Sequence, residues 1–150
     1  MSGFSVANNI TLRSYYATYR AFTTKSTRSS ATTNQLNYAD AQALRRAVQK
    51  LDDFDFETAD KDDISSHVRA FIDTYNYTMD SAKSSTNSYA TSTYKNLKNL
   101  ASKYSKDLEN IGIKENSSGY LALSSSAVEN ISGRRFKSLL NKDSKFMKQL

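Results

Sequence analysis

The chain contains no cysteine, no proline and no tryptophan. Without cysteine it has no disulfide framework and no thiolate zinc site, which fits a cytosolic protein and equally an exported one that travels unfolded. No apolar run approaches the ~20 residues that a membrane-spanning helix needs, so we expect no membrane span. Residues 1–16 lack a continuous apolar core, and we therefore expect no signal peptide.

Acidic residues are also missing from one part of the chain. Residues 1–39 contain none, whereas the segment from Asp40 to Asp63 holds eight, and the stretch from Ile113 onward is basic again. The net charge is +6. Basic ends around an acidic middle could attract nucleic acid or an anionic membrane, or they could complement each other within or between subunits.

What the chain does contain is aromatic bulk and helical periodicity. Ten Tyr and seven Phe predict a Tyr-rich core, and 150 residues suit a single compact unit. Apolar residues spaced three and four apart indicate helices rather than strands. The predicted helices cover residues 10–22, 38–51, 62–82 and 90–111.

The segment between the first two predicted helices has a different composition. Residues 23–36 are almost wholly Ser, Thr and charged residues. They contain too few apolar side chains to compensate for the conformational entropy that is lost when a segment becomes ordered. We therefore predict two regions: residues 1–36, an N-terminal helix plus a flexible Ser/Thr-rich basic linker, and residues 37–150, a helical domain.

The predicted helices 62–82 and 90–111 are joined by a short polar run, and each carries one apolar stripe. This predicts a mainly all-α fold built on an antiparallel helical hairpin or bundle. The stripe on the second helix must be buried against another helix of this chain or against a second chain. Gly112 is placed as a left-handed residue after the helix, with Leu108 and Ile113 at the positions whose apolar contact accompanies a Schellman stop.

A short β element is predicted near the C-terminal end. Gly119 offers a turn, and the alternation in Tyr120–Leu123 is typical of a short strand. The capping-box spacing of Ser126 and Glu129 predicts a small helix, which Gly133 interrupts. A last amphipathic piece completes the chain.

Three stretches carry a resemblance: FIDTYN from Phe71, LKNLASKYSKDLENIGIKENSSGYLALS from Leu97, and SLLNKDSKFMKQL from Ser138. In this order they resemble the bacterial flagellar filament-capping protein family, over about residues 64–150. In that family a helix ending in a Val-Asp-Ala-Tyr-Asn type sequence precedes one that closes with Leu-x-x-Ile-Gly-Ile, followed by Gly-x-Leu-x-Leu-Asp. Ser124 stands where the family usually has Asp.

The resemblance implies a structural protein of the bacterial flagellum, located in an extracellular appendage; apart from the resemblance we expect a cytoplasmic protein. The family's proteins are much larger, with outer β-rich domains and a further C-terminal helix, so this chain resembles a reduced relative. The residues that we expect to have structural or assembly roles are Phe71, Tyr75, Leu97, Tyr104, Leu108, Ile111, Gly112, Ile113, Gly119, Leu121 and Leu123.

The sequence offers little for catalysis or metal binding. His67 is the only histidine, and Asp63 four residues earlier could pair with it, but a dyad would still need a nucleophile in a cleft. A calcium loop starting at Asp53 fails, because Thr58 replaces the glycine and Ile64 the bidentate glutamate. No phosphate-binding glycine loop or dinucleotide motif is present. We expect no enzyme, no cofactor, no metal and no small-molecule substrate.

Two functions remain as predictions. The first is a non-enzymatic structural or assembly protein that acts through helix-mediated association, with protein partners or by self-association. The alternative is a basic helical nucleic-acid-binding module, whose binding would depend steeply on salt.

Overall fold

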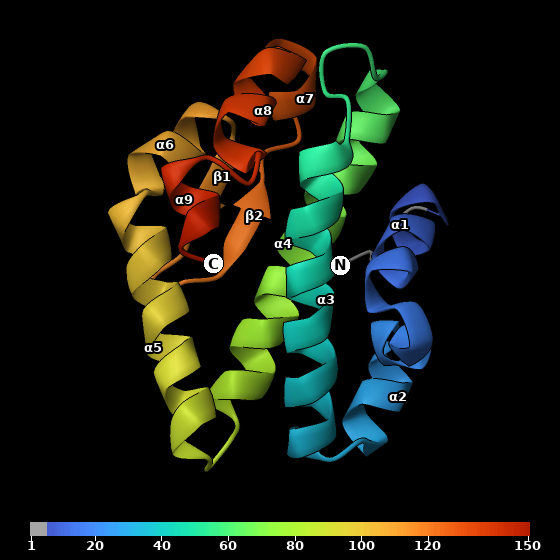
Figure 1. Cartoon of the computed structure of the whole chain (residues 1–150), viewed down its shortest axis with the longest axis vertical. Helices are drawn as coiled ribbons and strands as arrows, with labels where there is room; N and C mark the ends of the chain where they lie inside the picture. The colour runs from blue at the N-terminus through green and yellow to red at the C-terminus, as the bar shows by residue number, and fades with distance from the viewer. Residues whose placement is uncertain (1–5) are drawn as a thin grey trace.

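The computed structural model describes residues 6–150. Among these residues, three long helices follow one another in the middle of the chain, shorter helices precede and follow them, and one small sheet lies toward the C-terminal end (Figure 1). The elements are, in chain order, α1 (Val6–Tyr16), η1 (Ala17–Thr23), α2 (Lys25–Ser30), α3 (Thr33–Asp53), α4 (Lys61–Lys83), α5 (Ser88–Lys103), α6 (Ser105–Asn110), β1 (Ile113–Glu115), β2 (Leu121–Leu123), α7 (Ala127–Asn130), α8 (Gly133–Leu140) and α9 (Lys145–Lys148). The mainly all-α prediction is confirmed.

Helix α4 is the centre of the fold, because it contacts α1, α3, α5, β2 and α7. Its first turn is capped, since the Asp60 carboxylate accepts a hydrogen bond from the Asp63 backbone N–H at 2.8 Å. Buried side chains lie on several sides of it: apolar ones such as Val68, Phe71 and Met79, and small polar ones such as Thr74 and Ser81. A helix buried on several sides is a core element rather than a surface one.

Helices α4 and α5 form the predicted antiparallel hairpin. They contact each other and are joined by the turn at residues 84–87, where the Asn87 side chain caps α5 by accepting from the Tyr89 backbone N–H. The two helices meet at this turn and spread apart toward the other end, where the β1–β2 hairpin lies between them (Figure 1). The stripe of α5 is therefore buried against this chain.

The prediction of one continuous helix over residues 90–111 is wrong, because the helix is broken. The backbone leaves helical geometry at Tyr104 (φ −106°, ψ 21°), which separates α5 from α6. The break turns α6 toward β1, which it contacts. Leu108 and Ile111 remain buried after the break, so the apolar spacing is preserved although the helix is not straight.

The predicted glycine stop is confirmed. Gly112 has φ +80°, a conformation that side chains with a Cβ rarely adopt, and its N–H donates to the Glu109 carbonyl at 2.9 Å. Leu108 and Ile113 on either side are fully buried. A Cβ on Gly112 would also lie 2.1 Å from the Cβ of Ala127, so glycine is required for packing against α7 as well as for the turn.

The predicted strand at residues 120–123 is confirmed as β2, whereas its partner β1 was not predicted. The strands are antiparallel, with Ile113 opposite Leu123 and Glu115 opposite Leu121. In the connecting turn, Gly119 has φ +88°. Because a three-residue strand carries almost no periodicity, the Ile113–Glu115 segment gave no signal of its own.

The N-terminal predictions need two corrections. The helix predicted over residues 10–22 ends at Tyr16, and η1 follows from Ala17, which has φ +51°. Residues 23–36, predicted as a linker, are mostly helical, in α2 and the start of α3. A capping box starts α3, in which the Thr32 hydroxyl accepts from the Gln35 N–H and the Gln35 side chain accepts from the Thr32 N–H.

The C-terminal segment also departs from the prediction in detail. Ser126 precedes α7, but its side chain makes no capping hydrogen bond, and the Glu129 carboxylate instead lies 3.2 Å from Lys61 Nζ. Gly133 does not interrupt a helix but begins α8, where a Cβ would lie 1.9 Å from the Phe56 carbonyl oxygen. The last amphipathic piece consists of α8 and α9, with Phe136, Leu140 and Phe146 fully buried.

The buried hairpin seam predicts the effect of a charge at Leu97, which is 6 % exposed. Leu97→Asp should lower the free energy of unfolding by several kcal/mol, because it places an unpaired carboxylate among apolar side chains. Thermal unfolding followed by circular dichroism measures the effect. Lys95→Asp, at an exposed position of the same helix, is the control and should change stability little. Equal melting temperatures of Leu97→Asp and Lys95→Asp would contradict the buried position of Leu97 in the hairpin.

Candidate functional site

Most of the residues predicted to have structural or assembly roles lie in the core of this chain. Tyr104, Gly112 and Leu123 are half-buried. The others are buried, and they are Phe71, Tyr75, Leu97, Leu108, Ile111, Ile113, Gly119 and Leu121. The structure brings them together around the α4–α5 hairpin and the small sheet. They are covered mainly by this chain, and two of them, Tyr104 and Ile111, also line the cleft between α6 and the α8–α9 segment.

Two polar residues of the Phe71–Asn76 stretch connect the hairpin to the sheet. The buried Tyr75 hydroxyl lies 3.0 Å from the carbonyl oxygens of both Leu97 and Gly119. The Asn76 side-chain amide donates to the Leu121 carbonyl at 2.8 Å, and its oxygen accepts from the Leu121 N–H at 2.9 Å. These contacts fix α4, α5 and β2 relative to one another.

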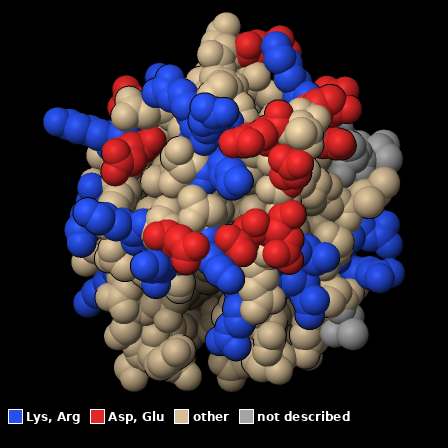
Figure 2. Space-filling view, turned by 45° about the horizontal axis from the view of Figure 1, so that its top comes forward, with Lys and Arg blue, Asp and Glu red and all other residues tan. Residues whose placement is uncertain are grey.

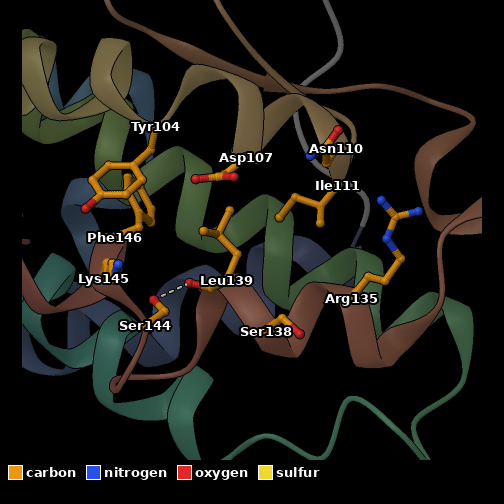
Figure 3. Close-up of a pocket in the computed structure, with 10 residues that line it drawn as sticks. All are labelled: Tyr104, Asp107, Asn110, Ile111, Arg135, Ser138, Leu139, Ser144, Lys145 and Phe146. Carbon is orange, nitrogen blue, oxygen red and sulfur yellow. Dashed lines mark hydrogen bonds between the residues drawn. The ribbon is translucent and has the colours of Figure 1, made fainter.

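A cleft of about 370 Å³ opens between α6 and the α8–α9 segment. Its apolar lining comes from both sides: Ile111 projects from the end of α6, which it directly follows, and Leu139 projects from α8 (Figure 3). Tyr104 and Phe146 close one end with their rings edge to face, at a centroid distance of 5.7 Å. The volume is sufficient for one large side chain or a small ligand.

The rim of this cleft carries both signs of charge. Asp107, Arg135 and Lys145 line it and are exposed, and none of the three forms an ion pair with a described residue. The Ser144 hydroxyl is already committed, because it donates to the Leu139 carbonyl at 2.6 Å and accepts from the Met147 N–H. The arrangement suits the binding of an apolar group with a polar edge.

A second hollow, of about 410 Å³, lies beside α2. Arg28 lines it and makes the structure's buried ion pair: its two terminal nitrogens each lie 2.8 Å from an Asp40 oxygen. The Arg28 side chain is 9 % exposed and that of Asp40 is fully buried. The guanidinium also lies 3.9 Å from the centroid of the Tyr77 ring.

The Asp40 carboxylate accepts one further hydrogen bond, from the Tyr16 hydroxyl at 2.6 Å. Burial, followed by the charge of Asp40, raises the pKa of Tyr16 well above its ordinary value, so this hydroxyl stays a donor. Together Tyr16, Arg28 and Asp40 join α1, α2 and α3. Sequence reasoning missed this cluster, because Arg28 fell in the predicted linker.

The acidic connection between α3 and α4 is partly neutralised by the C-terminal segment. Arg134 pairs with Glu57 at 3.5 Å and Lys142 with Asp52 at 3.6 Å. These pairs confirm that oppositely charged regions complement each other within the chain. Figure 2 shows the consequence: acidic and basic side chains are interleaved in the upper part of that view, and only basic ones are seen below.

The net charge belongs to one part of the chain. Residues 1–51 contain seven Lys and Arg and one acid, Asp40, whereas the rest of the chain contains fourteen basic and fourteen acidic residues. Asp40 is buried and paired with Arg28. The excess of +6 therefore resides entirely in the region that forms α1, η1, α2 and most of α3.

The residues considered for catalysis are not arranged for it. His67 Nδ1 lies 2.8 Å from the backbone carbonyl of Asp63 rather than from its carboxylate, and the imidazole stacks on Phe54 at 4.0 Å. The Asp55 carboxylate accepts from Glu57 and Thr58 within its own turn. No cluster of possible metal ligands occurs among residues 6–150, and no helix in that range is long and apolar enough to cross a membrane.

Comparisons with known proteins add no relative. No family model, no curated protein and no solved structure matches this chain.

The buried Arg28–Asp40 pair predicts a large loss of stability when one partner is neutralised. Asp40→Asn should lower the free energy of unfolding by about 3 kcal/mol or more, because it leaves a buried guanidinium without its counter-charge. Chemical denaturation measures the effect, with the exposed Asp53→Asn on the same helix as the control. A difference below about 0.5 kcal/mol from wild type would show that the pair does not hold the N-terminal region.

The half-buried Asp73 on α4 predicts that the free energy of unfolding depends on pH. Burial raises the pKa of its carboxyl from 3.8 to about 7, although the charge of Arg69 opposes this. Between these values the folded chain holds a proton that the unfolded chain has lost, so the Asp73 contribution to stability falls as pH rises through this interval. The free energy of unfolding is measured by chemical denaturation at several pH values. Asp73→Asn should remove its decrease with rising pH, and the exposed Asp143→Asn should not. The same pH dependence in wild type and Asp73→Asn would contradict the raised pKa.

Proposed function

We propose that the chain is a non-enzymatic structural or assembly protein of the kind that the flagellar-cap resemblance implies, and that it acts by associating with proteins. One observation carries this proposal: the three stretches of the resemblance form a single connected unit. Tyr75 and Asn76 of the first stretch bond to Leu97, Gly119 and Leu121 of the second. In the third, Phe146 packs against Tyr104.

The mechanism proposed from the sequence changes in one point. The apolar stripes are buried within the chain, so they stabilise the scaffold and do not join subunits. The cleft between α6 and α8–α9 is the surface that we assign to a protein partner. Its apolar lining would receive a large side chain, and the unpaired charges of Asp107, Arg135 and Lys145 would set the orientation of the partner.

The chemistry of the cleft supports binding rather than a reaction. A nucleophile needs a base within hydrogen-bond reach. The hydroxyl groups of Ser138 and Ser144 instead donate to backbone carbonyls, those of Arg134 and Leu139. An enzyme that used His67 would lose its activity in His67→Ala, whereas the proposed association would not change.

Co-sedimentation with flagellar filaments from the same organism tests the proposal, and sedimentation velocity tests self-association. Wild type should pellet with filaments or form oligomers. Arg135→Glu combined with Lys145→Glu should weaken this association roughly tenfold or more, because it reverses the charge of the rim. Lys95→Glu combined with Lys114→Glu, exposed and outside the cleft, is the control with the same change in net charge. A folded chain that stays monomeric and in the supernatant would overturn the proposal.

A further inference from the structure

The region that holds the net charge presents six exposed basic side chains. We call this surface the basic N-terminal face, and its charged residues are Arg13, Arg20, Lys25, Arg45, Arg46 and Lys50. They come from α1, η1, α2 and α3, and η1 contacts the three others. None of the six forms an ion pair with a described carboxylate.

Asp40, the one acid of residues 1–51, cannot offset these charges, and of the acids outside that range Asp80 lines the second hollow together with Lys25. Asp40 is fully buried, and its carboxylate is occupied by Arg28 and Tyr16. In the rest of the chain, by contrast, acids and bases are equal in number and partly paired. A localised excess of positive charge with low-dielectric protein beneath it attracts a polyanion.

Aromatic rings lie within this basic face. Tyr38 on α3 is 56 % exposed, and its ring meets that of Tyr19 edge to face at 5.7 Å. Tyr19 stacks on Phe22 at 6.1 Å, which holds it in place. Arg20 adjoins Tyr19 in the chain, and Arg45 follows Tyr38 by two helical turns on the same side of α3. Each of the two elements that carry this ring pair therefore also carries an exposed arginine, Arg20 on η1 and Arg45 on α3.

We propose that the basic N-terminal face binds single-stranded nucleic acid. The arginines contact backbone phosphates, for which the planar guanidinium is well suited. An unpaired base stacks on the exposed Tyr38 ring, as bases do on aromatic platforms in single-strand-binding proteins. This binding is separate from the cleft on α6 and α8–α9, and it stands whether or not the chain assembles with proteins.

Two other anionic partners are alternatives to nucleic acid. An anionic membrane would favour an amphipathic helix with several bulky apolar side chains directed outward, whereas Ile10 is the one large aliphatic side chain that is exposed among the described residues. The acidic segment of a second copy is the other candidate, because Asp53, Asp62 and Asp63 are exposed and form no ion pair with a described residue; sedimentation velocity of the wild type detects that association.

Fluorescence anisotropy with a labelled oligothymidylate at about 50 mM salt tests the charge requirement. Wild type should bind, with an affinity that falls steeply as salt rises. Arg20→Glu combined with Arg45→Glu should reduce the affinity roughly tenfold or more. Lys95→Glu combined with Lys106→Glu changes the net charge equally at exposed positions of α5 and α6, and should have a much smaller effect. Circular dichroism verifies that each variant is folded.

A second pair of variants separates base stacking from charge alone. Tyr38→Ala should weaken oligothymidylate binding about fivefold or more, because the stacking platform is lost. Tyr89→Ala is the matched control, since Tyr89 is 82 % exposed but lies on α5, outside the basic face. Inorganic polyphosphate should bind Tyr38→Ala as well as it binds wild type.

Four results would overturn the proposal. The first is no binding of oligothymidylate by wild type. The second is an equal loss of affinity in the two double charge reversals, which would indicate an effect of net charge alone. The third is wild-type affinity in Tyr38→Ala, which would indicate attraction of any polyanion without recognition of bases. The fourth is binding to phosphatidylserine vesicles in preference to the oligonucleotide, which would assign the face to membranes.

Discussion

The contacts of Tyr75 and Asn76 hold the helical hairpin and the small sheet in one arrangement. Helices α4 and α5 meet only toward their shared turn, so apolar packing alone would leave their spread ends without a fixed angle. The Tyr75 hydroxyl reaches the carbonyls of Leu97 and Gly119, and Asn76 pairs with the backbone of Leu121 as a neighbouring strand would. A three-residue strand pair is weak alone, and these buried hydrogen bonds secure it to α4.

The Arg28–Asp40 pair orders a second region that apolar packing could not. The Ser/Thr-rich segment before α3 has little to bury, which is why its composition predicted a flexible linker. A bidentate ion pair with a tyrosine donor and an aromatic face makes up for that deficit. The pair also removes the one acid of residues 1–51 from the surface. The same contact thus folds the N-terminal region and leaves its exterior basic.

The helices and the glycine stop were predictable because their signals are local. Apolar spacing marked α3, α4 and α5, and Gly112 followed its helix at the position where a positive φ is common. The breaks at Tyr104 and Ala17 carried no local signal. Contacts far apart in the sequence, such as Lys142 with Asp52, were not predictable from residue types either, because many bases and acids could have paired. The cleft of Figure 3 depends on how α8 and α9 fold back, which no periodicity encodes.

The distribution of charge separates two surfaces with different chemistry. From Asp52 onward the acids and bases balance, and part of them pair across the α3–α4 connection and α8; this suits a surface that associates through shape and a few oriented charges. The N-terminal helices have no such balance, since Asp40 is buried and the arginines around Tyr38 have no described acidic partner. Like charges on one face repel each other, and this repulsion opposes folding. An anionic partner at this face would remove that repulsion, so its binding would also stabilise the N-terminal helices.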